Sequence, residues 1–112
     1  MSAEADEWYG VRCVFQGTHG EGAPFEERIT LWRADSLDAA IEQAEGEARE
    51  YAENVGMTYL GLAQAYATGE TEIESGAEVF SLLRDSPLPP EEYLDRYFDS
   101  GGERQGVVSD PE

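Results

Sequence analysis

The stretch from Ser36 to Gly56, SLDAAIEQAEGEAREYAENVG, decides the fold. Apolar residues recur in it at helical spacing while charged residues fill the other side, a pattern typical of an amphipathic helix on a sheet. The apolar set is Leu37, Ile41, Ala44, Ala48, Tyr51, Ala52 and Val55, and the polar set is Asp38, Glu42, Glu45, Arg49, Glu50 and Glu53. Asp35 or Ser36 can cap the start, Gly56 suits a left-handed end, and Gly46 indicates close packing or a slight bend.

Two alternating segments precede this helix and predict a long β-hairpin. From Trp8 to Gln16 the inward side holds Tyr9, Val11, Cys13 and Phe15, and the outward side holds Trp8, Arg12 and Val14. From Phe25 to Arg33 we expect Phe25, Ile29 and Leu31 inward, with Glu26, Arg28, Thr30 and Trp32 outward. A period of two is that of a half-buried strand.

Two further segments follow the helix. Residues 58–68 and 77–85 are rich in aromatic and aliphatic residues and predict a second hairpin across the acidic, glycine-bounded stretch 69–76. A helix over residues 59–67 is the alternative, because AQAYA has good helix propensity. The start of Pro90–Phe98 has proline and acids in its first turn, which predicts a short C-terminal helix.

These elements predict an α+β protein: a mainly antiparallel four-stranded sheet in ββαββ order, with one long helix on a face and a short C-terminal helix. A length of 112 residues suits one domain, which we place at residues 8–99. Residues 1–7 and 100–112 are expected to be flexible tails, because they are small, charged or rich in glycine and offer little to bury.

The charge is strongly acidic: 25 acids oppose 7 arginines, no lysine occurs, and the net charge is −18. Without lysine, Schiff-base and P-loop chemistry are excluded, and a chain repelled by phosphates is not expected to bind nucleic acid. A basic partner is the converse expectation, and solubility or a host-wide acidic bias is the other reading. The acidic start MSAEADE and the short apolar runs predict a cytoplasmic protein with no membrane span.

Few residues offer reactive chemistry. Cys13 and His19 are the only residues of their kinds, so a disulfide or a zinc cluster cannot form and a catalytic dyad is disfavoured. The loop from Gly17 to Gly22 leads to a strand instead of a helix, and the acids at Glu70, Glu72 and Glu74 lack calcium-loop spacing. We therefore expect no enzyme activity, no cofactor and no metal.

The arginines and tryptophans of the first hairpin indicate a binding surface instead. Trp8, Arg12, Arg28 and Trp32 are expected to share its outward face, and tryptophan and arginine dominate interaction hot spots. The alternative is structural: the arginines bridge to nearby glutamates, and the short C-terminal helix half covers the tryptophans.

Four strings together resemble an uncharacterised family of small bacterial proteins, a domain of unknown function. They are Trp8-Tyr9, the E-R-I-x-L pattern within Phe25–Leu31, the helix entry Ala34–Glu45, and the G-x-E-V-x-S pattern Gly76–Ser81. The resemblance spans about residues 8–86 and implies a ββαββ order with no assigned activity.

Taken together, these features predict a non-enzymatic protein-interaction module. It would self-associate, as a homodimer, or bind a basic protein partner as an immunity protein or antitoxin does. The alternative is a small-molecule-binding protein or enzyme with a pocket between sheet and helix, where Tyr51, Tyr59, Tyr66 and Arg84 would gather.

Overall fold

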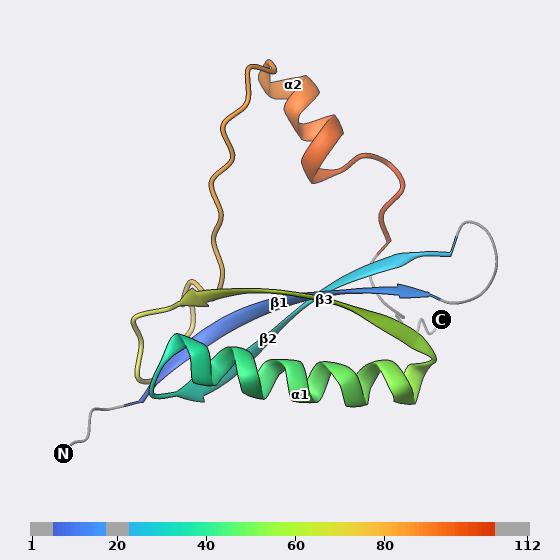
Figure 1. The fold of residues 1–112 in the computed structure, drawn as a ribbon. Helices are drawn as coiled ribbons and strands as arrows, with labels where there is room; N and C mark the ends of the chain where they lie inside the picture. The colour runs from blue at the N-terminus through green and yellow to red at the C-terminus, as the bar shows by residue number, and fades with distance from the viewer. Residues whose placement is uncertain (1–5, 18–22, 105–112) are drawn as a thin grey trace, which may run out of the picture. The chain divides into compact units, whose positions relative to one another are not determined.

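The computed structural model describes residues 6–17 and 23–104. Its elements are β1 (Glu7–Gly17), β2 (Phe25–Ala34), α1 (Leu37–Val55), β3 (Met57–Ala67), α2 (Pro90–Tyr93) and a further helical turn, η1 (Leu94–Phe98) (Figure 1). The chain divides into two compact units, Met1–Ser81 and Leu82–Glu112. His19 and most of the two expected tails lie outside the described residues, and the single domain over 8–99 stays a prediction.

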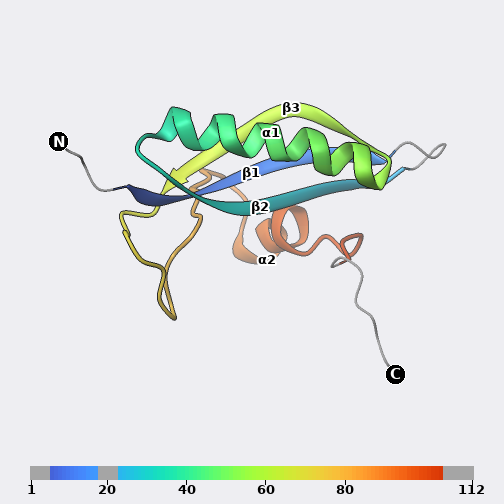
Figure 2. The same cartoon turned by 90° about the horizontal axis from the view of Figure 1, so that it is seen from below.

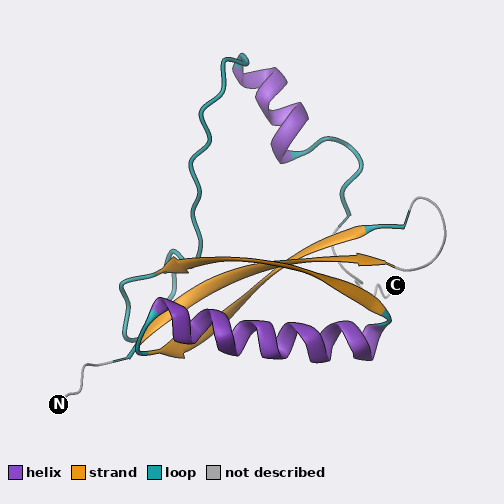
Figure 3. Ribbon diagram, in the orientation of Figure 1, coloured by secondary structure: helices purple, strands orange, loops and turns teal. Residues whose placement is uncertain are grey.

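The first unit is an α+β arrangement, as expected, with three antiparallel strands in the order β2-β1-β3 and α1 on one face (Figure 3). The central strand β1 places Cys13 opposite Arg28 on β2 and opposite Ala63 on β3. The β3 register shifts next to Cys13, where Leu60, Gly61 and Leu62 oppose Val14 alone. Gly61 has a φ of +82°, which favours glycine at this bulge.

The long helix begins and ends as predicted. The Ser36 hydroxyl accepts a hydrogen bond from the Ala39 backbone N–H at 3.1 Å, and Gly56 ends the helix at a φ of +77°. The prediction of close packing at Gly46 is wrong, because a Cβ added there would meet nothing within 4 Å.

The core lies between α1 and β1. The inward side of β1 is confirmed, since Tyr9, Val11, Cys13 and Phe15 are all buried. On α1 the buried positions form an alanine stripe, Ala40, Ala44, Ala48 and Ala52. Leu37 and Val55 were expected inward but are exposed. Small residues let the helix approach the sheet closely, so the large core side chains come from the strands.

The predicted faces of β2 are wrong. Because Cys13 pairs with Arg28 and Tyr9 with Trp32, the side of β2 towards α1 carries Glu26, Arg28, Thr30, Trp32 and Ala34. The apolar residues Phe25, Ile29 and Leu31 face away from the helix and are exposed. Strands usually turn their apolar side towards a covering helix. Here polar groups of α1 supply partners for the charged side of β2, so that side faces the helix instead.

The predicted fourth strand over residues 77–85 is absent, so the order is ββαβ and the sheet has three strands among the described residues. Residues 77–80 instead lie over the sheet at Gly10, where an added Cβ would come far closer to the Val79 carbonyl oxygen than van der Waals contact allows. This contact is made on a face of the sheet. Backbone hydrogen bonds between strands form only at an edge, so residues 77–80 cannot pair as a strand there. The strand at Met57–Ala67 is confirmed, and the helical alternative for that segment is wrong.

The second unit contains the short C-terminal helix, which is confirmed. It starts at Pro90 with Glu91 and Glu92 in its first turn. Its last turn is widened, since the Asp99 backbone N–H donates to the Leu94 carbonyl at 2.8 Å.

Candidate protein-interaction surface

The sheet has one face covered by α1 and one face, called the open face, that α1 leaves free (Figure 2). Successive side chains of a strand point to opposite faces, so every second residue belongs to the open face. These residues are Trp8, Gly10, Arg12, Val14 and Gln16 of β1, Phe25, Glu27, Ile29, Leu31 and Arg33 of β2, and Thr58, Leu60, Leu62, Gln64 and Tyr66 of β3.

Large apolar side chains of the open face are exposed on both outer strands. On β2, Phe25 is 61 % exposed, Ile29 46 % and Leu31 38 %, while on β3 Leu60 is 40 % and Leu62 66 % exposed. An antiparallel sheet with one solvated face normally turns polar residues to water on that side. Exposed apolar groups gathered on one face are instead typical of a surface that contacts a partner.

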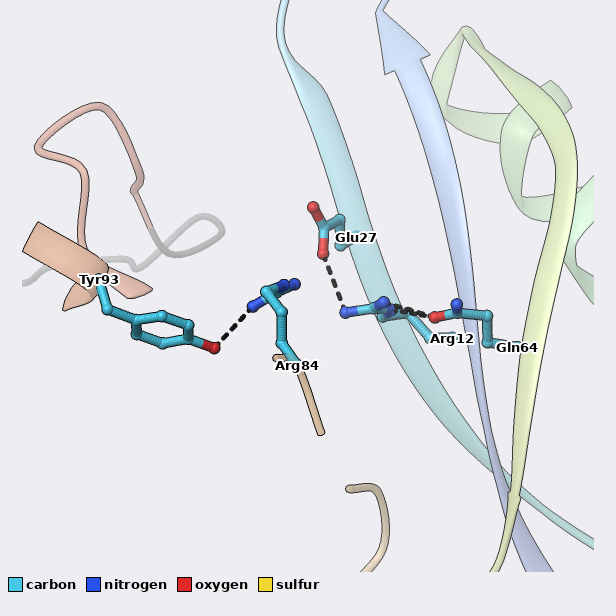
Figure 4. Close-up of polar contacts among 5 residues, drawn as sticks. All are labelled: Arg12, Glu27, Gln64, Arg84 and Tyr93. Carbon is cyan, nitrogen blue, oxygen red and sulfur yellow. Dashed lines mark hydrogen bonds and ion pairs between the residues drawn. The ribbon is translucent and has the colours of Figure 1, made fainter. Parts of the chain in front are cut away.

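Arg12 lies between these two apolar rows. Its Nε donates to the Gln64 Oε1 at 3.1 Å, and its Nη1 lies 3.4 Å from the Glu27 Oε1 (Figure 4). The charged residues that the strands place on the open face are Arg12, Glu27 and Arg33, a formal charge of +1 within a chain of −18. The open face is therefore free of the acidic excess that characterises the rest of the chain.

Residues 77–80 lie against one part of the open face and are called the strap. The Glu78 carboxylate accepts a hydrogen bond from the Tyr66 hydroxyl, which raises the pKa of Tyr66. The Phe80 ring lies 6.0 Å from the Tyr66 ring and 5.2 Å from the Arg12 guanidinium carbon. These side-chain contacts hold the strap on the open face, and the Val79 backbone carbonyl lies directly over Gly10.

The outer edge of β2 is the second unusual feature of this side of the protein. The Gly17 N–H donates to the Pro24 carbonyl at 2.8 Å, and hydrogen-bonded pairs alternate along an antiparallel ladder. The even-numbered residues from Glu26 to Ala34 therefore bond to β1. The backbone groups of the odd-numbered residues Phe25–Arg33 point to the outer edge, where no strand pairs among residues 6–17 and 23–104.

The four predicted binding residues do not share a face. Trp8 and Arg12 lie on the open face, opposite Arg33 and Ile29 of β2. Arg28 and Trp32 lie on the face covered by α1, where each is only partly exposed. The exposed apolar residues of the open face were missed, because the phase of β2 was assigned by apolarity alone. Pairing Arg28 with a helix carboxylate would have indicated the opposite phase.

Arg28 is held by α1. Its two terminal nitrogens lie 2.9 and 2.8 Å from the two Glu47 carboxylate oxygens, and its guanidinium carbon is 3.7 Å from the centre of the Tyr51 ring. The hydrogen bonds to Glu47 raise the pKa of Arg28, and those from Arg28 lower the pKa of Glu47. Tyr51 donates to Glu26 at 2.7 Å, a bond that raises the Tyr51 pKa. Arg28 thus has the structural role of joining β2 to α1.

The predicted pocket lined by Tyr51, Tyr59, Tyr66 and Arg84 is not formed in the first unit. Tyr51 and Tyr59 lie on the α1 side, Tyr66 lies on the open face, and Arg84 belongs to the second unit. A separate groove of about 550 Å³ runs between the end of α1 and the start of β3, past Glu45, Arg49 and Tyr59. The Tyr59 hydroxyl donates to Glu45 at 2.5 Å, and burial raises the pKa of Tyr59 and of the neighbouring Cys13 thiol. Both shifts favour the protonated forms of the two groups.

The second unit has its own arginine and tyrosine cluster. Arg84 donates to the Tyr93 hydroxyl at 2.9 Å (Figure 4), and its guanidinium carbon is 4.2 Å from the centre of the Tyr97 ring. Contacts of this kind stabilise the short helix within its unit.

Searches of the described residues and of known proteins add no assigned activity. No group of three or more histidine, cysteine or acidic side chains is arranged to hold a metal ion in the part of the chain that the structure describes. Within that part, no helix has the length and apolarity to cross a membrane. Comparison with protein-family models, curated proteins and solved structures finds no match for this chain. The resemblance to an uncharacterised bacterial family stays a prediction.

Proposed function

We propose that this chain is a non-enzymatic protein-interaction module that self-associates through its sheet at β2, the strand that presents apolar side chains on the open face. The observation that supports the proposal is the inverted pattern of β2. Its charged side is satisfied by α1, while Phe25, Ile29 and Leu31 are presented to solvent. Burying such residues against a partner contributes about 25 cal/mol per Å² of apolar surface removed from water, from which the entropic cost of association is subtracted.

Charge favours the open face over the outer side of α1. The outer side of α1 carries Asp38, Glu42, Glu50 and Glu53, so two copies meeting there would repel each other. The strand residues of the open face carry a formal charge of +1, and Glu78 of the strap brings the total there to zero. Association through the sheet brings two chains of −18 together at their least acidic surface, and added salt should strengthen it by screening the remaining repulsion.

Sedimentation velocity between about 1 and 200 μM tests this proposal. We expect a reversible dimer whose dissociation constant falls when sodium chloride rises from about 0.05 to 0.5 M. Ile29→Glu should weaken the dimer by at least about tenfold, because it places an acid among the exposed apolar residues. Leu83→Glu is the matched control, since Leu83 is 96 % exposed in the second unit and the charge change is the same.

A monomer at every concentration and salt would refute self-association. Binding of a basic protein to the acidic side of α1, the other form of an interaction module, would then be tested by titration with a polyarginine peptide. A small molecule in the groove beside Tyr59 is the alternative from a different class. Its test is a thermal-shift screen in which Tyr59→Phe abolishes a ligand's effect.

A further inference from the structure

We infer that two copies of this chain pair antiparallel along the outer edge of β2, with Thr30 of each copy on the two-fold axis, to form one six-stranded sheet. The inference rests on the proposed self-association and adds its geometry and register. It is carried by the outer edge of β2, which no strand of the described residues pairs, together with the order of residues along that strand.

Backbone geometry limits the possible registers. An antiparallel partner must bond to the odd-numbered residues of β2, because the even-numbered residues already bond to β1. A two-fold axis through Thr30 meets this requirement, since it places odd residues opposite odd residues. In this register Thr30 faces its own copy as a pair without backbone hydrogen bonds, and the flanking residues form the ladder.

On the open face, this register places opposite charges across from each other and apolar residues across from each other. Glu27 lies opposite Arg33 of the second copy, and Ile29 lies opposite Leu31 of the second copy. By symmetry both matches occur again on the other side of the axis. Opposite charges and branched apolar residues directly across an antiparallel pair stabilise it, whereas like charges destabilise it.

The residues that would form the charge pairs are available in a single chain. The Arg33 side chain is exposed and forms no ion pair or side-chain hydrogen bond within the described residues. The Glu27 side chain is 63 % exposed and has only the long 3.4 Å contact with Arg12. Both are free to reach across an edge that would otherwise invite unspecific pairing.

The α1 side is compatible with the same register. Arg28 lies opposite Trp32 of the second copy, which places a guanidinium beside an indole ring, a favourable cation–π arrangement. Arg28 keeps its Glu47 partner in this arrangement, because that bond is made to the helix of its own copy. Two of the four residues predicted to bind a partner, Arg28 and Trp32, therefore meet across the dimer edge even though the four do not share one face.

A charge-swap cycle in the full chain tests the register. Arg33→Glu should raise the dimer dissociation constant by about tenfold at 0.15 M salt, since Glu27 would then oppose a second acid. Adding Glu27→Arg should bring it back to within about threefold of the unmodified protein. Arg49→Glu has the same change of net charge as Arg33→Glu but lies on α1, so it should have a much smaller effect.

A disulfide cross-link gives a second measurement that does not depend on charge. In a Cys13→Ala background, Thr30→Cys should form a covalent dimer within minutes under copper-phenanthroline oxidation. Thr58→Cys on β3 is the control and should not, because β3 lies at the opposite edge of the sheet. Circular dichroism is the check that each variant keeps its fold.

The outcomes separate the two proposals. A dimer that Ile29→Glu weakens, but that the charge swap does not restore and Thr30→Cys does not cross-link, overturns the edge register and leaves the interaction module standing. Restoration together with cross-linking at position 30 supports both. A monomer under all conditions overturns the register and the proposed self-association together.

Discussion

The two faces of the sheet differ in where β2 places its alternating residues: its charged residues lie under α1 and its apolar residues lie on the open face. Beneath α1, charged residues of β2 are accepted because each meets a partner: Arg28 meets Glu47, and Glu26 meets Tyr51. On the open face, apolar residues of the same strand are left in water. The comparison teaches that the buried side of β2 does not follow from hydrophobicity. It follows from the ion pair between Arg28 and Glu47 and from the pairing of β2 with β1. The apolar side of β2 is therefore left available for a partner.

The largest expected effect comes from the covered face. Phe15 is fully buried and packs edge-on against Tyr51 at 5.1 Å between ring centres, so Phe15→Ala should lower the free energy of unfolding by about 3 to 5 kcal/mol. Phe25→Ala, on the open face, should change it by less than about 1 kcal/mol in dilute solution. Urea denaturation at about 1 μM compares them. Equal losses would show that the open face is covered within a single chain.

A second variant probes where the open face is packed. Gly10→Ala would place a methyl group against the Val79 carbonyl, so we expect the strap to be displaced at a cost of about 1 to 3 kcal/mol. Hydrogen exchange at residues 77–80 should accelerate. Phe80→Ala, which removes the contacts of its ring with Tyr66 and Arg12 and leaves Gly10 unchanged, should accelerate the same amides. Unchanged exchange in Gly10→Ala would show that the strap does not rest on Gly10.

The ion pair under α1 predicts a pH-dependent stability. The pKa of Glu47 is lower in the folded protein, so its contribution is fully present above the ordinary glutamate value of about 4.5 and is lost as pH falls through the folded pKa. Glu47→Gln should cost about 1 to 2 kcal/mol at pH 7, a difference that closes under acid. Glu50→Gln, exposed on α1, is the control. A loss that is the same at pH 7 and pH 3 would contradict the ion-pair argument.

The smallest effect is expected on the outer side of α1. Gly46→Ala should stabilise the protein by about 0.5 to 1 kcal/mol, because the added methyl meets nothing within 4 Å and alanine favours a helix. Gly56→Ala should destabilise it by about 1 kcal/mol, since its φ is +77°. Thermal melts measure both. A destabilising Gly46→Ala would indicate that this side of α1 also packs against something.

Local features of the fold could be predicted from neighbouring residues. The Ser36 cap, the Gly56 end and the alternation of β1 depend on side chains and backbone within a few residues of each other, and all three are confirmed. The helical core was predicted less well. Leu37 and Val55 are the more apolar residues, yet the alanine stripe is buried, because only small side chains allow α1 to lie against the large residues of β1.

The sequence placed only part of the predicted binding set on one face. Trp8 and Arg12 lie on the open face as expected, while Arg28 and Trp32 belong to the covered side. The missing information was a contact between residues 28 and 47, which no short-range pattern contains. The strap was mistaken for a strand for a similar reason. Its apolar residues are typical of a strand. Because Gly10 has no side chain, however, the backbone of the strap can lie against the face of the sheet.

The sequence by itself determined the α+β class, the capped helix, the phase of β1 and the strong acidity of the chain. Each follows from composition or from periodicity over a few residues, where local sterics and hydrogen bonds decide the outcome. Only the tertiary structure decided which side of β2 is buried, that residues 77–80 form a strap, and that the described residues leave the outer edge of β2 unpaired. These depend on pairings between distant residues, whose free energies outweigh the preference of any single strand.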